Sequence, residues 1–229
     1  MSKPRVFEIP VGMRDYLPEV VARKRGLEAI LQRVMESWGY REIMTPTLEF
    51  YDTVGGASAT LDKKLFKLLD RQGQTLVLRP DMTAPIARVV SSYYREEIFP
   101  VRLLYHASVY RAQEEEAGRS AEFYQTGVEL VGDTTPAADA EVLALAVACL
   151  KAVKVENFRL AVSHVGFLDG ILKERVPEED LRRTLKQDLL ERNYVGFRNH
   201  VGQGGLASED REALLRLLSL RGGEEKLAE

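Results

Sequence analysis

The run Ala121-Glu122-Phe123-Tyr124-Gln125-Thr126-Gly127-Val128-Glu129-Leu130-Val131 decides the fold expected for this chain. Its aromatic and β-branched residues predict a β-strand, in which successive side chains point to opposite faces of a sheet. One face carries Tyr124, Val128 and Leu130, with Thr126 between them. This composition is typical of a protein core, so we expect that face to be buried.

The opposite face of this strand carries polar groups. Its residues are Phe123, Gln125, Gly127 and Glu129. A glycine between an amide and a carboxylate leaves room for a ligand on that face. A solvated sheet face with two ordinary polar residues explains the same pattern, and spacing alone favours that simpler explanation.

Other polar residues are candidates for the same site. Arg111 ends the preceding predicted strand and Arg119 lies in the following loop, so together they bracket Gln125 and Glu129 and could hold an anion. Residue types alone favour two surface arginines facing the glutamates at 114–116. Asp81 and Thr83 lie where a strand turns into a helix, and capping that helix is their simpler role.

Periodicity and turn residues give a coarse map of the rest of the chain. Helices are expected at residues 15–39, from Asp81 or Thr83 to about Tyr94, and at 137–153, 166–173, 178–192 and 208–220. Extended segments are expected at 41–46, 101–111 and 158–163, with a hairpin at 65–69 and 75–78 and a mobile loop at 53–60. We therefore predict a mixed α+β core over residues 1–175 and a helical segment over 176–229.

Composition excludes several classes of protein. Hydrophobic residues make up 45% of the chain and the net charge is -3, which is typical of a soluble globular protein without a general attraction to nucleic acid. No run approaches the ~20 apolar residues that cross a bilayer, and we expect no signal peptide, because no apolar run follows the first residues. A single cysteine, Cys149, in an apolar run favours the cytoplasm. His106, His164 and His200 are far apart, so neither a metal nor a cofactor is expected.

Four segments match one protein family in order and spacing. They are Gly12-Met13-Arg14-Asp15-Tyr16-Leu17-Pro18, the run Gly39-Tyr40-Arg41-Glu42-Ile43-Met44-Thr45-Pro46-Thr47-Leu48-Glu49, the run Leu78-Arg79-Pro80-Asp81-Met82-Thr83-Ala84, and Tyr110-Arg111 through Gly118-Arg119 to the strand quoted above. As a set they resemble histidyl-tRNA synthetases and their paralogues over roughly residues 6–170. The resemblance implies an incomplete class II aminoacyl-tRNA synthetase-like antiparallel sheet with flanking helices.

The resemblance also implies a histidine site. In such synthetases four positions surround the histidine ammonium group. The matching residues here are Asp81, Thr83, Gln125 and Glu129. Arg111 matches a further histidine-binding position, Arg119 matches a possible anion contact, and Pro46 matches a proline at the dimer interface.

Departures from the synthetase pattern point to a second branch of the family. The run Arg111-Ala112-Gln113-Glu114-Glu115-Glu116 replaces Arg-x-Glu-Arg-Pro-Gln, and three adjacent carboxylates oppose the binding of polyanions such as ATP and tRNA. Asp81-Met82 replaces Glu-Gly, and Ala121 replaces a basic residue. These changes resemble the regulatory subunits of ATP phosphoribosyltransferase. They imply a protein without catalytic residues that forms a homodimer within a hetero-oligomer with the short catalytic subunit, activates it and makes it sensitive to L-histidine.

Two alternatives stay open from the residues alone: a histidyl-tRNA synthetase or a fragment of one, and a free-standing amino-acid ligase. The chain carries no match to the family's Arg-Gly-Leu-Asp-Tyr-Tyr segment, to motif 3 or to an anticodon-binding domain. We therefore expect a shortened chain. Feedback histidine would bind either in this pocket or at the interface with the catalytic subunit.

Overall fold

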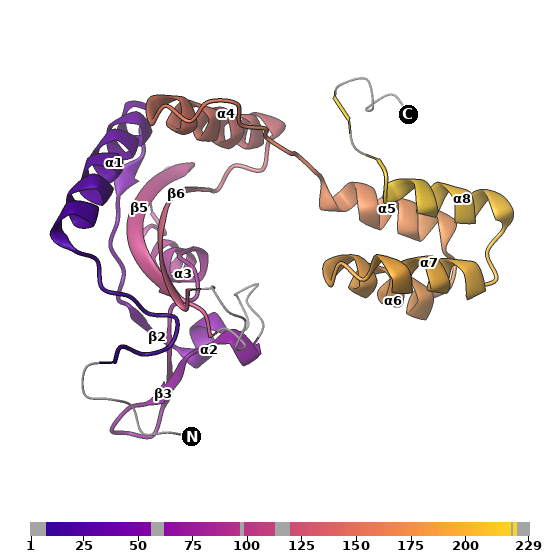
Figure 1. Cartoon of the computed structure of the whole chain (residues 1–229), viewed down its shortest axis with the longest axis horizontal. Coiled ribbons are helices and arrows are strands. Elements are labelled where there is room, and N and C mark those ends of the chain that lie inside the picture. The colour runs from indigo at the N-terminus through magenta and orange to yellow at the C-terminus, as the bar shows by residue number, and fades with distance from the viewer. Residues whose placement is uncertain (1–7, 56–61, 97–98, 113–119, 221, 224–229) are drawn as a thin grey trace. The chain divides into compact units, whose positions relative to one another are not determined.

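The structure is a computed structural model that describes residues 8–55, 62–96, 99–112, 120–220 and 222–223. It divides the chain into two compact units, residues 1–158 and 159–229, which are described separately (Figure 1). The division precedes the boundary expected near Val176, and Val176 itself is buried among the helices of the second unit.

A three-stranded sheet organises the first unit. Its long strands, β5 (Val101–Tyr110) and β6 (Glu122–Val131), pair antiparallel from Val101 opposite Val131 to Tyr110 opposite Glu122. The short strand β1 (Arg41–Glu42) runs parallel to the other side of β5. The predicted α+β class is thus confirmed, and the two long strands form the expected antiparallel pair.

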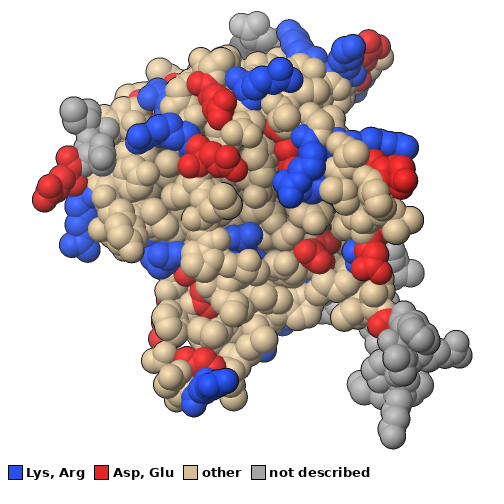
Figure 2. All heavy atoms as spheres, turned by 90° about the vertical axis from the view of Figure 1, so that its left-hand side faces the viewer, with Lys and Arg blue, Asp and Glu red and all other residues tan. Residues whose placement is uncertain are grey.

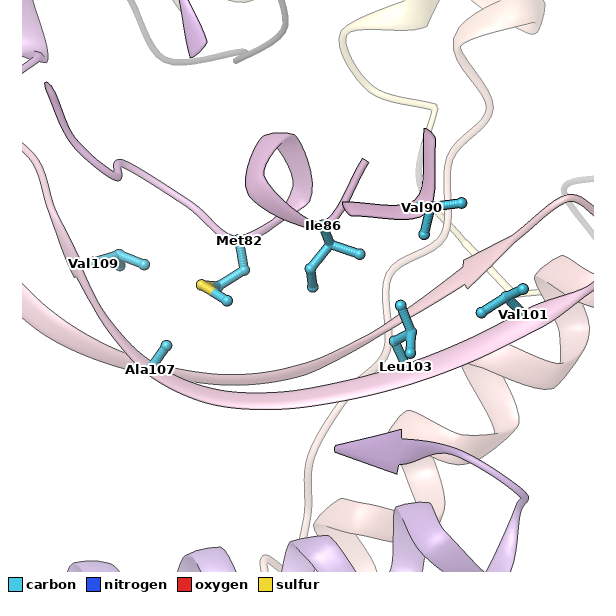
Figure 3. Close-up of a cluster of buried hydrophobic side chains, with 7 residues drawn as sticks. All are labelled: Met82, Ile86, Val90, Val101, Leu103, Ala107 and Val109. Atoms are coloured by element: carbon cyan, nitrogen blue, oxygen red, sulfur yellow. The ribbon is translucent and has the colours of Figure 1, made fainter. Parts of the chain in front are cut away.

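Helix α3 (Thr83–Tyr93) covers one face of this sheet. Met82, directly before the helix, and Ile86 and Val90 within it lie against side chains of β5, as Figure 3 shows. Those side chains are Val101, Leu103, Ala107 and Val109. Phe123 and Val131 of β6 border the same cluster. Helix α3 therefore largely covers the face of the sheet for which spacing alone favoured a solvated surface.

Helices α1 (Pro18–Ser37) and α4 (Pro136–Ala152) cover the other face. Leu104 and Val128 of the sheet pack there with Met35 and Leu145 of the helices. The prediction that this face of β6 is buried is confirmed at Val128 and is wrong at Tyr124, which is 44% exposed. Both α1 and α4 begin with proline, which lacks the N–H that a first turn leaves unbonded.

A second, smaller sheet follows β1 in the chain. Strands β2 (Leu48–Phe50) and β3 (Lys67–Leu69) flank β4 (Thr75–Leu78), and the β3–β4 pair confirms the predicted hairpin. The loop predicted from residue 53 was wrong at its start, because Thr53 and Val54 belong to α2 (Tyr51–Val54) and Val54 is buried. Residues 56–61 of that loop lie outside the described residues. A short 3₁₀ helix, η1 (Asp62–Lys64), precedes β3.

Arg79 ties the two sheets together. Its buried guanidinium donates from Nε to the carbonyl of Ser108 at 2.9 Å and from Nη1 to the carbonyl of Thr45 at 2.8 Å. A planar fork of donors suits several fixed carbonyl groups at once. Arg79 thereby fixes the segment before β2 against β5.

The second unit contains four helices in its described part: α5 (Val165–Arg175), α6 (Glu179–Leu190), α7 (Tyr194–Gln203) and α8 (Ser208–Leu217). They enclose a cluster that includes Leu185, Phe197 and Leu214. The sequence analysis missed α7, whose first turn is capped by the Asn193 side chain. The strand predicted at 158–163 was wrong: that segment pairs with no strand, and Val162 is exposed.

Two surface properties complete the description. Within the described residues, no helix combines the length and apolar character needed to cross a membrane. On the face shown in Figure 2, acidic and basic side chains are interspersed.

The buried contact between the sheet and helices α1 and α4 predicts a stability effect. Leu104 is fully buried, so Leu104→Ala is expected to lower the free energy of unfolding by about 2–5 kcal/mol. Leu69 of β3 is exposed, and Leu69→Ala is expected to change it by no more than about 0.5 kcal/mol. Urea unfolding monitored by circular dichroism measures both, and equal effects would contradict this assignment of the core.

Candidate functional site

The first turn of α3 meets the polar face of β6. Thr83 donates a hydrogen bond from Oγ1 to Glu129 Oε1 at 2.8 Å. Met82, rather than Asp81 or Thr83, occupies the N-cap position before α3, and Asp81 Oδ1 accepts a long 3.4 Å bond from the Ala84 backbone. The Thr83 hydroxyl therefore does not cap the helix. It donates its hydrogen bond to Glu129 on the neighbouring strand instead.

Glu129 lies in an unfavourable environment for a negative charge. Burial raises the pKa of its carboxyl group above the ordinary value, the hydrogen bond from Thr83 lowers it, and the Asp81 carboxylate raises it further. Two carboxyl groups that share a poorly hydrated site attract a cation. An ammonium group, with three donors, would relieve both the burial and the repulsion.

Gln125 shares the sheet face with Glu129. Its Oε1 atom is buried and has no hydrogen-bond partner in the described part of the chain. A buried acceptor without a partner is costly and rare in proteins. Gln125 therefore offers an acceptor that a ligand donor would satisfy.

Tyr105 is the pocket residue that the sequence analysis missed. It lies opposite Gly127 in the β5–β6 ladder, on the same face as Gln125 and Glu129. A Cβ atom at position 127 would stand 2.6 Å from Tyr105 Oη. The room expected at Gly127 for a ligand is thus taken by the Tyr105 ring. Knowing which residues of β5 and β6 lie opposite each other would have revealed this contact. The sequence alone does not give that register.

Arg111 lies at the edge of the site, where it contacts the residue before Asp81. Its Nε donates to the Pro80 carbonyl at 2.9 Å, and its guanidinium lies 5.3 Å from the centre of the Phe123 ring. Phe123 is on the polar face of β6, so the cation is held at the edge of the pocket. Arg119 and the glutamates at 114–116 lie outside the described residues.

Comparison with known proteins shows the family of the chain. A family model described as Histidyl-tRNA synthetase matches residues 12–229. The chain belongs to the histidyl-tRNA synthetase family. The resemblance drawn from its motifs is therefore confirmed.

Relatives within the family share about half of their residues with this chain. The ATP phosphoribosyltransferase regulatory subunit of Halalkalibacterium halodurans is 51% identical over 229 residues, which is 100% of this chain and 58% of that protein. The protein of the same name from Geobacillus thermodenitrificans is 52% identical over 222 residues, or 97% of this chain and 56% of that protein. The chain thus spans somewhat more than half the length of these relatives.

A solved structure extends the comparison to the fold. The protein described as an ATP phosphoribosyltransferase regulatory subunit/histidyl-tRNA synthetase from Bacillus halodurans matches with a TM-score of 0.92 at 50% identity. The match covers 99% of this chain and 59% of that one. The family fold is therefore present in this chain over nearly its whole length.

Other residues singled out from the sequence lie apart from the pocket. Pro46 is exposed between β1 and β2, and its carbonyl accepts from Arg79 Nη1 at 3.3 Å. Cys149 is buried, which raises the pKa of its thiol. Among the described residues, no cluster of histidine, cysteine, aspartate and glutamate side chains has the geometry of a metal site.

Because the pKa of Glu129 is raised, replacing its carboxyl group is predicted to stabilise the fold by an amount that depends on pH. A carboxyl group whose pKa is raised by folding binds its proton more tightly in the folded state, so stability falls as pH rises above the ordinary glutamate value. Glu129→Gln removes that loss while keeping an acceptor for Thr83. The variant is expected to melt at a higher temperature than the parent at pH 7.

The advantage of Glu129→Gln should shrink as the pH approaches about 4, near the ordinary glutamate pKa, because the parent carboxyl group is then protonated. Glu156→Gln, at an exposed position, is the matched control and should leave the melting temperature unchanged at both pH values. Thermal melting of the ligand-free proteins measures the difference. A variant that melts no higher than the parent at pH 7 would contradict the account of Glu129.

Proposed function

We propose that the chain acts in histidine biosynthesis as a non-catalytic regulatory subunit of ATP phosphoribosyltransferase, in the cytoplasm. The observation that carries the proposal is the identity of 51% over 229 residues to a relative of that name. In this role it assembles with the short catalytic subunit, activates it and makes it responsive to L-histidine. Neither a cofactor nor tRNA takes part in this role.

The chemistry of the pocket supports a histidine ligand. Glu129 and Asp81 supply negative charge, Thr83 holds Glu129 in place, and Gln125 offers an unsatisfied acceptor. These groups match an ammonium ion, and Arg111 stands at the edge of the pocket to meet a carboxylate. A free amino acid carries both charges.

The pocket predicts how histidine affinity depends on Glu129. Glu129→Gln replaces a charge-assisted contact by a neutral one, which is expected to cost about 1.5–3 kcal/mol of binding free energy. Histidine affinity should then fall about 10- to 150-fold, because each 1.4 kcal/mol is a factor of about ten. Calorimetric titration compares the parent with this variant.

Glu156→Gln again serves as the matched control and should bind histidine as the parent does. Equal affinities for the parent and Glu129→Gln would place the feedback histidine elsewhere. The interface with the catalytic subunit would then be the place to search.

The assembly proposal predicts direct association with an enzyme. Co-expression with a tagged short-form ATP phosphoribosyltransferase is expected to yield a complex, and adding the purified chain to that enzyme should raise its turnover. The chain alone is expected to show no histidine-dependent ATP–pyrophosphate exchange. Exchange above background, with no binding or activation of the catalytic subunit, would instead indicate a synthetase or amino-acid ligase.

An exposed apolar sheet face supports the homodimer. Residues paired across neighbouring strands point to the same side of a sheet, so five leucine and phenylalanine side chains share the outer face of the small sheet. They are Leu48, Phe50, Leu68, Leu76 and Leu78. Leu48, Phe50 and Leu68 are exposed. This face begins two residues after Pro46, the residue that the family resemblance assigns to the interface, and a twofold contact would cover it.

The dimer proposal makes a testable prediction for this face. The parent chain is expected to be a dimer at tens of micromolar, roughly the working range for a weak association. Phe50→Lys, which places a charge on the outer face, is expected to shift it to the monomer. Leu69→Lys, on the opposite face of the same sheet, is the control and should remain dimeric. Light scattering decides, and a monomeric parent would contradict the proposal.

A further inference from the structure

Helices α7 and α8 of the second unit (Figure 1) border an open groove. Its volume is about 550 Å³, within the range of sites that bind small molecules. Phe197 of α7 and Leu214 of α8 are fully buried in the apolar cluster of this unit. They anchor the two helices from inside, so the fold of the second unit holds the walls of the groove in place.

Three arginines line this groove: Arg198 of α7, and Arg211 and Arg216 of α8. The lining contains one carboxylate, Glu212. The side chains of Arg198 and Arg211 have neither a hydrogen bond nor an ion pair within the described part of the chain. Like charges gathered in one groove repel each other, and a bound anion would relieve that repulsion.

Other arginines of the second unit are engaged by the protein itself. Arg175 contacts Asp210 Oδ1 at 3.2 Å and Glu209 Oε1 at 3.6 Å. Arg182 donates from Nη1 to the Val176 carbonyl at 2.7 Å. These arginines stabilise the helical unit, whereas the two groove arginines without a partner can bind a ligand.

Gly202 leaves the groove open on the side of α7. It lies within that helix and is not among the described residues with a positive φ angle, so any residue could adopt its backbone conformation. A Cβ atom at this position would have no neighbour within 4 Å, so packing does not require glycine either. Glycine is unfavourable inside a helix. A ligand that lies against the helix backbone would explain its presence.

The lining indicates the kind of ligand. Guanidinium groups donate paired hydrogen bonds to phosphate oxygens. Leu215 offers an exposed apolar surface, and the Glu212 carboxylate can accept a hydrogen bond from a hydroxyl group. A nucleic-acid backbone carries a phosphate at every nucleotide, so it would also meet Glu212 and the exposed Glu209 in the first turn of α8, which repel it. The groove therefore suits one small phosphate ester better than a nucleic acid.

We propose that the groove between α7 and α8 binds a small phosphorylated metabolite with a hydroxylated ring. Arg198, Arg211 and Arg216 hold its phosphate group. Its ring lies against Gly202 and Leu215. All groups of this site belong to the second unit, so the inference depends neither on the proposed histidine pocket nor on the regulatory role.

Calorimetric titrations with ribose 5-phosphate and with AMP test the site. Both carry a phosphate ester on a hydroxylated ring, and AMP adds a base, so the comparison tells a sugar phosphate from a nucleotide. The parent is expected to bind at least one of them. Arg198→Gln and Arg211→Gln are each expected to lower that affinity about tenfold, the loss of one charge-assisted contact. Affinity of the parent should also fall as the salt concentration rises, because salt screens exposed charges.

A third groove variant and two controls separate binding from folding. Gly202→Leu fills the groove and should weaken binding at least as much as either arginine variant. Gly26→Leu, in α1, is its control, because a Cβ atom has open space there too. Arg183→Gln, which removes an exposed arginine 3.5 Å from Glu179, is the control for charge. Both controls should bind as the parent does, and circular dichroism of each variant confirms that it folds.

The outcomes are distinct. A folded parent that binds neither ribose 5-phosphate nor AMP overturns the inference, and so do equal affinities for the parent and the three groove variants. Binding of duplex RNA that the arginine variants lose, with neither small phosphate bound, also overturns it and assigns the groove to nucleic acid. Activation of the catalytic subunit reports separately on the regulatory role.

Discussion

The antiparallel ladder between β5 and β6 fixes the position of every group in the pocket. Because Tyr105 stands opposite Gly127, a shift of one residue would move Gln125 and Glu129 to the α1–α4 side of the sheet. Apolar contacts on both faces prevent that shift: Leu103 packs under α3 and Leu104 under α1 and α4. Hydrophobic burial on both sides of one sheet thus determines where its polar residues point.

The same packing explains why the pocket is electrostatically strained. Met82 and Ile86 bring the first turn of α3 onto the sheet, and Thr83 and Asp81 follow them to Glu129. Glu129 is thereby removed from water beside a second carboxyl group, which raises its pKa and lowers the stability of the ligand-free protein at neutral pH. Stability lost at a binding site is a common consequence of function, and a bound ammonium group would restore it.

Sequence reasoning succeeded where local patterns decide the structure. Alternation along β6 separated Val128 from Glu129, and periodicity placed two helices, expected at 15–39 and 137–153, close to the observed α1 and α4. It failed where a contact between residues far apart in the sequence determines the structure. Tyr105 becomes a pocket residue only through its pairing with Gly127, and Thr83 bonds Glu129, 46 residues away, instead of capping α3. Residues 158–163 alternate as a strand would, but they pair with no strand in the part of the chain that the structure describes.

We propose that Glu129, Asp81 and Thr83 hold the ammonium group of a bound amino acid. A crystal structure of the chain grown with L-histidine tests it most directly. The account predicts histidine with its amino nitrogen about 2.7–3.2 Å from a Glu129 carboxylate oxygen, within hydrogen-bond range. Histidine bound at another surface, with this pocket unchanged, would contradict it.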